Sequence, residues 1–505
     1  MLGKERKAIN KNFIKKIIIN FLITILIGLF SFIANKYFAN YMGIEKLGLM
    51  KLFTQIMAYL NLVDMGIASA STYALYEPLY KKNTERISII INTITSLYNK
   101  IFFLILIIGL LINPAIPFFI KDNIFSKEIY LYWSLYVINT AITYLFVKYS
   151  ILFTANQEFL YVRIVQGMSK IFYQILQIIV IIKIHSFFLF IFLLILDNIT
   201  QYIFYKYHYK KYYSHIIKTH EKDKNIGENL KNLFWHKIAG LVVFNTDLIL
   251  ISKFISLEVV GIYASYQMIE QMILTILSII LNVLRPMIGK YIAIHTKEEI
   301  YNYWKKLNIF FLLISIIFSC CTYYLINGFV SLWLGKSYIL SDITVLLICI
   351  NLFVRCFRGI TEIFKDGSGF FDDIHLPIAE ATINFVSSLI LVFYLGLNGV
   401  ILGTILSNIL IISIAKPLLV FRRCFNKDYK EYIKIYGNYF LLIIFSLGIS
   451  KFLLNYISII EICTWIDWLK KAVLISSIVI IITLVIFIFN KDFRKGILYY
   501  KQGNK

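Results

Sequence analysis

The stretch AVLISSIVIIITLVIFIF, from Ala472 to Phe489, decides the kind of fold that this chain adopts. It contains no charged residue, and its length approaches the roughly 20 apolar residues that a helix needs to cross a hydrocarbon core of about 30 Å. The run is continuous and does not alternate between apolar and polar residues, as the strands of a membrane barrel do. Because backbone groups in lipid have to be satisfied internally, the run predicts a transmembrane helix.

Similar apolar stretches recur along the whole chain, and together they predict an all-α integral membrane protein with about 14 transmembrane helices. The stretches lie near 14–34, 52–72, 88–112, 129–153, 159–184, 186–205, 233–255, 262–284, 307–328, 338–358, 376–396, 398–420, 435–454 and 469–489. The composition agrees, with 59% hydrophobic residues, 16% charged residues and six prolines. The stretch at 159–184 is the weakest, because Arg163, Lys170, Gln174 and Gln177 interrupt it.

The basic residues follow these stretches in a regular way. Of the 51 Lys and Arg residues, 37 lie in the terminal tails and in alternate gaps between the apolar stretches. Since positive charge stays on the cytoplasmic side, both termini are predicted to be cytoplasmic in a multi-pass protein. Topology therefore accounts for most of the net charge of +23. No basic soluble module is present that would bind nucleic acid, and anionic membrane lipids are the expected partners of the basic loops.

Several function classes leave no trace in the sequence. The six cysteines and seven histidines show no metal-ligand spacing, so neither a metal nor another cofactor is expected. No GxxxxGK[ST] motif exists for a nucleotide-driven transporter. The gaps between apolar stretches are short, the longest being Lys206–Asn232, so the chain lacks the large loops of membrane glycosyltransferases.

The chain also shows an internal duplication. Met42–Leu49 (MGIEKLGL) and Ser256–Ile262 (SLEVVGI) both contain Glu-x-x-Gly and both lead into a new apolar stretch. A second echo joins Leu145–Lys148 (LFVK) to Leu352–Arg355 (LFVR). The first six spans therefore match the next six in order and orientation. We predict two six-helix lobes related by a pseudo-two-fold repeat at 1–205 and 233–420, a linker at 206–232, and two extra spans with a basic tail at 421–505.

Three segments resemble the bacterial polysaccharide flippases. The first part of the resemblance is Tyr41–Leu49 (YMGIEKLGL) followed by Leu62–Gly66 (LVDMG). The second part is Thr246–Asp247 followed by Glu258–Tyr263 (EVVGIY), and the third is Leu395–Gly403 (LGLNGVILG). That family belongs to the superfamily of the multidrug and toxin extruders and the lipid II flippase, and the resemblance covers the whole chain. It implies a two-lobed bundle with alternating access and no enzymatic activity.

The resemblance also implies a substrate and a place. The substrate would be an undecaprenyl-diphosphate-linked oligosaccharide unit, flipped across the bacterial cytoplasmic (inner) membrane for O-antigen of lipopolysaccharide, capsule or exopolysaccharide. Polysaccharide polymerase and chain-length proteins would be its partners. Two alternatives stay open, a drug or cation antiporter of the same superfamily and a membrane polysaccharide polymerase or ligase. The fourteen spans speak against the first alternative, and the short outer loops speak against the second.

Ionisable residues within spans usually face an interior cavity, and they are the candidate site residues. Lys148 and Arg355, at echoed positions, would each offer a cation to the diphosphate or to acidic sugars. The alternative is that they extend to the inner surface as anchors, and the same choice holds for Arg358. Glu380 and Asn384 share one helix face and would contact sugar hydroxyls.

Four further residues are candidates for coupling transport to a proton or sodium gradient: Asp64, His236, Asp247 and Glu270. His236 and Asp247 fall on one helical stripe, where a carboxylate and an imidazole would bind a cation or exchange a proton. The alternative is that these groups only join helices through hydrogen bonds. Lys100 and Lys170 stay open between a cavity and the membrane surface. By the same resemblance, the two extra spans would form a groove for the polyprenyl tail.

Overall fold

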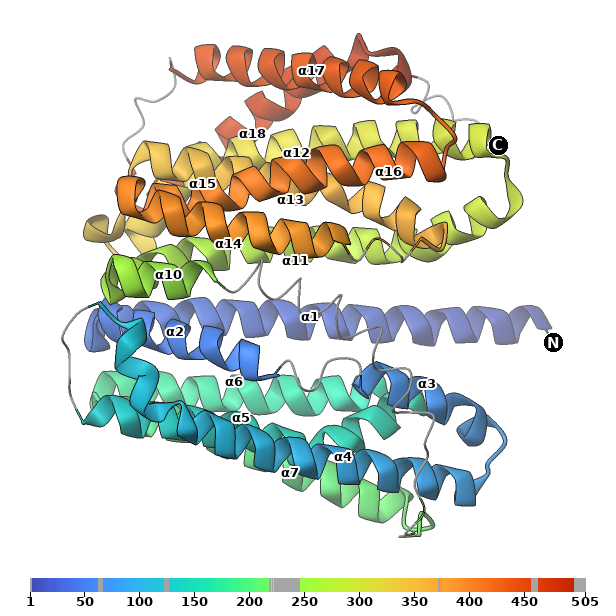
Figure 1. Cartoon of the computed structure of the whole chain (residues 1–505), viewed down its shortest axis with the longest axis vertical. Coiled ribbons are helices and arrows are strands. Elements are labelled where there is room, and N and C mark those ends of the chain that lie inside the picture. Colours follow the sequence, from blue (N-terminus) through green and yellow to red (C-terminus); the bar gives the residue numbers. More distant parts are fainter. Residues whose placement is uncertain are drawn as a thin grey trace. The chain divides into compact units, whose positions relative to one another are not determined.

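The computed structural model describes residues 2–61, 67–121, 127–217, 219, 221, 246–370, 373, 375–455 and 462–494. Within these ranges the regular secondary structure is all helical, without a strand (Figure 1). The long helices of the first half are α1 (Leu2–Met42), α4 (Thr84–Leu111), α5 (Glu128–Ala155), α6 (Phe159–Lys183) and α7 (Phe187–Tyr212), with the shorter α2 (Ile44–Leu60), α3 (Ile67–Tyr80) and α10 (Asp247–Phe254). The second half contains α11 (Leu257–Ile294), α12 (Lys297–Trp333), α13 (Asp342–Gly367), α14 (His375–Leu395), α15 (Leu397–Ser407), α16 (Lys416–Arg423), α17 (Tyr429–Asn455) and α18 (Trp465–Ile488).

Twelve of the described helices are long and apolar enough to cross a membrane, and each coincides with one of the fourteen predicted spans. The remaining two predicted spans, 52–72 and 233–255, include residues outside the described ranges. The all-α membrane fold class is therefore confirmed. The weakest predicted span, 159–184, is the continuous helix α6.

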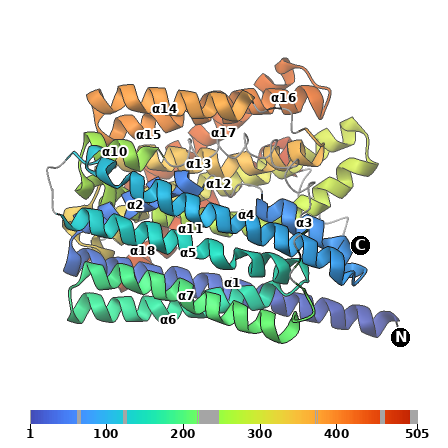
Figure 2. The ribbon, with the colours of Figure 1, turned by 60° about the horizontal axis from the view of Figure 1, so that its bottom comes forward.

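The chain divides into two compact units, Met1–Gly261 and Ile262–Lys505. In the first unit α6 packs against α1 and α7, and α5 packs against α4 and α7 (Figure 2). In the second unit α12 packs against α13 and α18, while α14 runs beside α15. The predicted limits at 205, 232 and 420 stay predictions, because the division into units does not test them.

One span of the second unit changes its helical geometry on the way across. α15 continues through a π-helical segment, η4 (Asn408–Ala415), into α16, and together they form the candidate span Leu397–Arg423. π-Helical turns are rare and occur often at functional sites. This segment fixes the positions of Asn408 and Lys416, which both belong to the polar network described below.

The two Glu-x-x-Gly motifs of the sequence meet in the first unit. Gly48, in the second turn of α2, faces the start of α11, and Gly261 faces the start of α2. A Cβ atom on Gly48 would collide with the carbonyl oxygen of Leu257, and one on Gly261 would collide with that of Ile44. Such a close approach of two helix backbones is possible only where side chains are absent. The repeated glycines are therefore packing residues.

We expect Gly48→Ala to lower the free energy of unfolding of the purified protein by about 2 kcal/mol or more, because the new methyl group has to displace backbone atoms. The melting temperature should fall accordingly. Gly28→Ala is the matched control, since nothing lies within 4 Å of a Cβ built on Gly28. That change should leave stability unaltered or raise it by up to about 1 kcal/mol through better helix propensity. Equal melting temperatures for the two variants in detergent would contradict the close contact.

Candidate functional site

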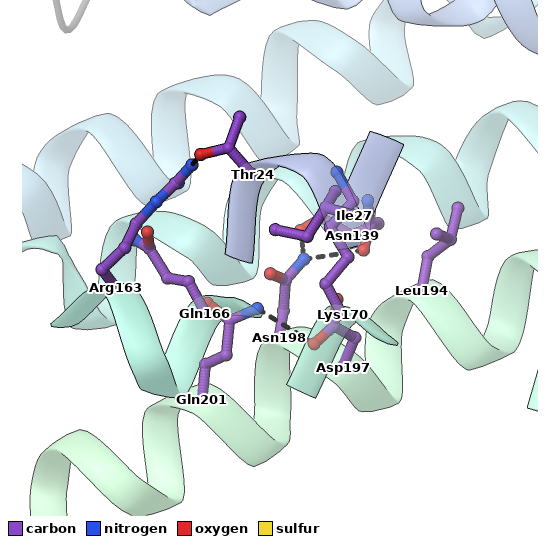
Figure 3. Close-up of a pocket in the computed structure, with 10 residues that line it drawn as sticks. All are labelled: Thr24, Ile27, Asn139, Arg163, Gln166, Lys170, Leu194, Asp197, Asn198 and Gln201. Atoms are coloured by element: carbon purple, nitrogen blue, oxygen red, sulfur yellow. Dashed lines mark hydrogen bonds between the residues drawn. The ribbon is translucent and has the colours of Figure 1, made fainter. Parts of the chain in front are cut away.

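A polar cavity of about 440 Å³ lies among four helices of the first unit (Figure 3). Its lining comes from α1, α5, α6 and α7 and consists of Thr24, Ile27, Asn139, Arg163, Gln166, Lys170, Leu194, Asp197, Asn198 and Gln201. All but Ile27 and Leu194 are polar or charged. Ligand pockets are usually lined mainly by apolar side chains. This one is suited to a ligand rich in hydroxyl groups or charge.

A polar stripe along α6 supplies much of this lining. Arg163, Gln166, Lys170, Gln174 and Gln177 follow one another at intervals of three or four residues, so they share one helix face. Gln174 donates to the Ser31 hydroxyl at 2.7 Å, and Gln177 donates to the carbonyl of Phe190 at 3.2 Å. The residues that weakened this span in the sequence thus point toward neighbouring helices and the cavity, which is why the segment can still cross the membrane.

Arg163 is held in place by neutral oxygen atoms. Its Nε donates to Asn20 Oδ1 of α1 at 2.8 Å. A terminal nitrogen donates to the Thr24 hydroxyl, also on α1, at 2.9 Å (Figure 3). Neither partner has a negative charge. A guanidinium has five N–H donors, so it keeps its full charge and spare donors after these two bonds.

Lys170 lies near the middle of α6, 11 residues from Phe159 and 13 from Lys183. At about 1.5 Å per residue, both helix ends are roughly 16 Å or more away, farther than a lysine side chain extends. In the part of the chain that the structure describes, no carboxylate forms an ion pair with Lys170. Lys51 of α2 is near enough for the two ammonium groups to repel each other. Lys170 is therefore a cavity residue.

Asp197 is the acidic residue of the cavity lining, and its partners are neutral. It accepts hydrogen bonds from the Ser169 hydroxyl and from Gln201 Nε2, the latter at 3.0 Å. Beside it, Asn198 donates to Asn139 Oδ1 at 2.8 Å (Figure 3). With Arg163 and Lys170, the lining has two positive charges and one negative charge.

The second unit contains a different arrangement, a stripe of polar residues along α13. Asn351, Arg355, Arg358 and Glu362 follow at intervals of four, three and four residues. Arg355 lies 12 residues before the end of α13 at Gly367, about 18 Å along the axis. It donates to Glu270 Oε1 at 2.8 Å and to Gln271 Oε1 at 3.4 Å, both on α11. Glu270 is 3% exposed, whereas the side chain of Arg355 is 22% exposed, so only the carboxylate side of the pair is fully buried.

The inner part of the α13 stripe forms a larger ion-pair network. Arg358 lies 3.1 Å from Glu362 and 4.0 Å from Glu380 of α14. Lys416 lies 3.2 Å from Glu380 and 3.6 Å from Glu362. One helical turn before Arg355 on α13, Asn351 Oδ1 accepts a hydrogen bond from Asn408 at 2.6 Å. The two cations and two carboxylates balance each other, in contrast to the cavity of the first unit.

The structure places the remaining candidates as follows. Lys148 is seven residues from the end of α5 at Ala155, with its ammonium 5.1 Å from the ring centre of Tyr149. Asn384 is fully buried and donates to the Thr404 hydroxyl at 2.9 Å, so it joins α14 to α15. Asp247 is buried in the first turn of α10, close to Tyr59. Asp64 and His236 lie outside the described residues.

Sequence reasoning missed part of both sites. Arg163, Gln166, Asp197, Asn198 and Gln201 were not proposed as site residues, although the interval of three and four residues on α6 is visible in the sequence. Lys416 was not proposed as a site residue either, because its pairing with Glu380 and Glu362 depends on contacts between helices. Within the described ranges, no group of His, Cys, Asp and Glu side chains could hold a metal ion.

Comparisons with known proteins agree with this architecture. The family model described as "polysaccharide biosynthesis protein" matches residues 13–292, more than half of the chain. No curated protein matches the chain. Among solved structures, the lipid II flippase MurJ in an inward closed conformation shares 15% identity at a TM-score of 0.66, covering 93% of this chain and 98% of that one.

Two transporters show the same fold. A multidrug resistance MATE family transporter of the MOP superfamily, in an inward-facing conformation, has 12% identity and a TM-score of 0.61, over 79% of this chain and 96% of that one. A variant of the MATE transporter VcmN of Vibrio cholerae has 14% identity and a TM-score of 0.53, over 84% and 99%. The predicted family and the predicted likeness to the MurJ and MATE folds are thus confirmed.

The ion-pair network predicts a stability effect that a double variant should reverse. Glu380→Gln leaves Lys416 and Arg358 sharing a single carboxylate, and we expect a loss of about 3 kcal/mol in the free energy of unfolding. Glu380→Gln combined with Lys416→Met should recover much of that loss, because charge balance returns.

Thermal unfolding in detergent measures these effects. Glu77→Gln is the control, since it breaks the exposed Glu77–Lys81 pair and should lower the melting temperature much less than Glu380→Gln does. If Glu380→Gln unfolded at the same temperature as Glu77→Gln, or if the double variant were the least stable, the network would not act as described.

Proposed function

The chain belongs to the polysaccharide biosynthesis protein family, and on this basis we propose that it flips lipid-linked oligosaccharide units across a membrane. The substrate would be an undecaprenyl-diphosphate-linked repeat unit of O-antigen, capsule or another exopolysaccharide. The observation that supports this most directly is the polar, net positive cavity among membrane-spanning helices of the first unit.

The chemistry of that cavity fits the physical problem of flipping. A lipid-linked oligosaccharide has many hydroxyl groups and a charged diphosphate, and hydrocarbon can solvate neither. A transporter therefore has to offer hydrogen bonds and positive charge inside the bilayer. Carboxamide and carboxylate groups at Asn139, Gln166, Asp197 and Asn198, together with the cations Arg163 and Lys170, provide both. A volume of about 440 Å³ is enough for part of such a head group.

The orientation proposed for the protein follows from its basic residues. With positive charge retained on the inside, both termini lie in the cytoplasm of a bacterial inner membrane, and the repeat unit moves from the cytoplasmic to the outer leaflet. Alternating access between two lobes would accomplish this without covalent chemistry. Polysaccharide polymerase and chain-length proteins would then receive the flipped unit.

A drug or cation antiporter is the second candidate, because MATE transporters share the fold. The charge of the cavity argues against it. A cavity lined by two cations and one carboxylate disfavours the binding of a cationic drug and favours the binding of an anionic ligand.

Reconstituted vesicles test the proposed function. We expect the purified protein to move undecaprenyl-diphosphate-linked oligosaccharide between leaflets, measured by the fraction of sugar that becomes accessible to an external glycosidase or lectin. Ethidium uptake into the same vesicles should stay at the level of protein-free vesicles. Ethidium transport without movement of the lipid-linked sugar would favour the antiporter instead.

We further propose that the ion pair between Arg355 and the buried carboxylate of Glu270 couples transport to a proton gradient. Protonation of Glu270 would neutralise the carboxylate and release Arg355, so the pair would have two states that a proton interconverts. The titratable groups facing Glu270 in the described structure are Arg355, Cys349 and Cys356, all on α13. Sodium would be the alternative coupling ion.

Glu270→Gln tests the coupling, because glutamine keeps the shape of the side chain and cannot titrate. We expect this variant to lose the dependence of flipping on an imposed pH gradient in vesicles, while wild type and Glu258→Gln retain it. Glu258 is the control, as an exposed carboxylate in the first turn of the same helix. A Glu270→Gln variant that still responds to the gradient as wild type does would remove this residue from the coupling step.

A further inference from the structure

We propose that Lys170 and Arg163 form an anion-recognition subsite that selects lipid-linked glycans bearing an acidic sugar. The subsite lies in the cavity of the first unit, where the two cations would bind the acidic group and the neighbouring amides would bind adjacent hydroxyls. This inference rests on the proposed flippase function and adds to it a substrate class. The diphosphate of the lipid anchor is the other possible source of the anion, and the experiment below separates the two.

The contrast between the cations of the two units is the first argument. In the second unit Arg355, Arg358 and Lys416 each lie within 4.0 Å of a carboxylate. In the first unit Arg163 is positioned by neutral oxygens, and no ion pair with Lys170 occurs among the described residues. An unpaired charge at the depth of Lys170, near the middle of α6, is unfavourable in a membrane. A bound anion would supply the missing compensation.

The available donors are the second argument. Arg163 has two of its five N–H groups engaged on α1, and these bonds fix the guanidinium at the edge of the cavity (Figure 3). Lys170 contributes three ammonium donors from the same face of α6, seven residues or about two turns away. Charge-assisted hydrogen bonds from both residues would hold one oxyanion more strongly than neutral groups could.

Asp197 adds selectivity. It lines the same cavity, and its hydrogen-bond partners Ser169 and Gln201 are neutral. A group with several negative charges is repelled by this carboxylate, whereas a singly charged sugar carboxylate meets less repulsion. Asp197 and the Asn139–Asn198 pair also offer acceptor oxygens for the hydroxyls of a sugar ring. The combination favours an acidic sugar over the diphosphate.

Binding in lipid nanodiscs tests this subsite with three probes. They are undecaprenyl diphosphate alone, the same lipid with a glucose disaccharide, and the same lipid with a disaccharide that contains glucuronate in place of one glucose. We expect wild type to bind the glucuronate probe about tenfold more tightly than the glucose probe. Lys170→Gln and Arg163→Gln should abolish this preference, and Lys183→Gln, an exposed position at the end of the same helix, should preserve it.

Two other results for Lys170→Gln would lead to different conclusions about the subsite. Equal loss of affinity for all three probes in Lys170→Gln would support the anion subsite and identify the diphosphate as its ligand. Unchanged affinities in Lys170→Gln would overturn the subsite. Arg163→Gln removes contacts between α1 and α6 and could reduce folding, so each variant is checked by its melting temperature. Lys170→Gln breaks no ion pair among the described residues and therefore decides the question if Arg163→Gln is unstable.

Failure of this inference and failure of the proposed function give different results. If wild type flips the lipid-linked disaccharides in vesicles while Lys170→Gln binds and flips them as Lys183→Gln does, the subsite is wrong and the flippase function stands. If wild type flips neither disaccharide, the function is wrong. Free glucuronate and glucose, compared for their protection of the protein against thermal unfolding, would then still test the subsite.

Discussion

Charge inside the hydrocarbon core is the constraint on which this structure depends. A mid-membrane cation has to be paired, extended to the surface or solvated in a cavity, because lipid offers it no partner. Two of these solutions are evident among the described residues. Arg355, Arg358 and Lys416 are paired with carboxylates. Lys170 is too deep to extend to the surface and lines a polar cavity instead.

The two units differ in how the charges of their cations are balanced. The second unit contains a network in which cations and carboxylates balance each other, and its members join α11, α13, α14 and α16. The first unit contains a cavity whose charges are not balanced internally. Removing one partner of a buried ion pair is unfavourable, so these pairs stabilise the helix arrangement that the structure shows. An unbalanced polar cavity suits the part that receives a ligand.

The sequence was sufficient for the fold and only partly sufficient for the site. Continuous apolar stretches such as Ala472–Phe489 determine helices by length and composition alone, and α18 contains nearly all of that stretch. The repeat motifs were recognised, but their meaning was not, because the crossing of Gly48 and Gly261 is a contact between distant segments. The role of Lys170 depended on where α6 begins and ends. The partner of Arg355 lies 85 residues away on another helix, and no local pattern indicates such a pair.

The π-helical segment Asn408–Ala415 has a consequence for motion within its span. One residue more or less in a helical turn rotates everything beyond it by about 100° and shifts it by about 1.5 Å. If this segment returned to α-helical geometry, Lys416 would turn away from Glu380 and Glu362. A change in this segment would therefore rotate the end of the span about its own axis. The ion pairs of Lys416 stabilise the one rotational position that the structure shows.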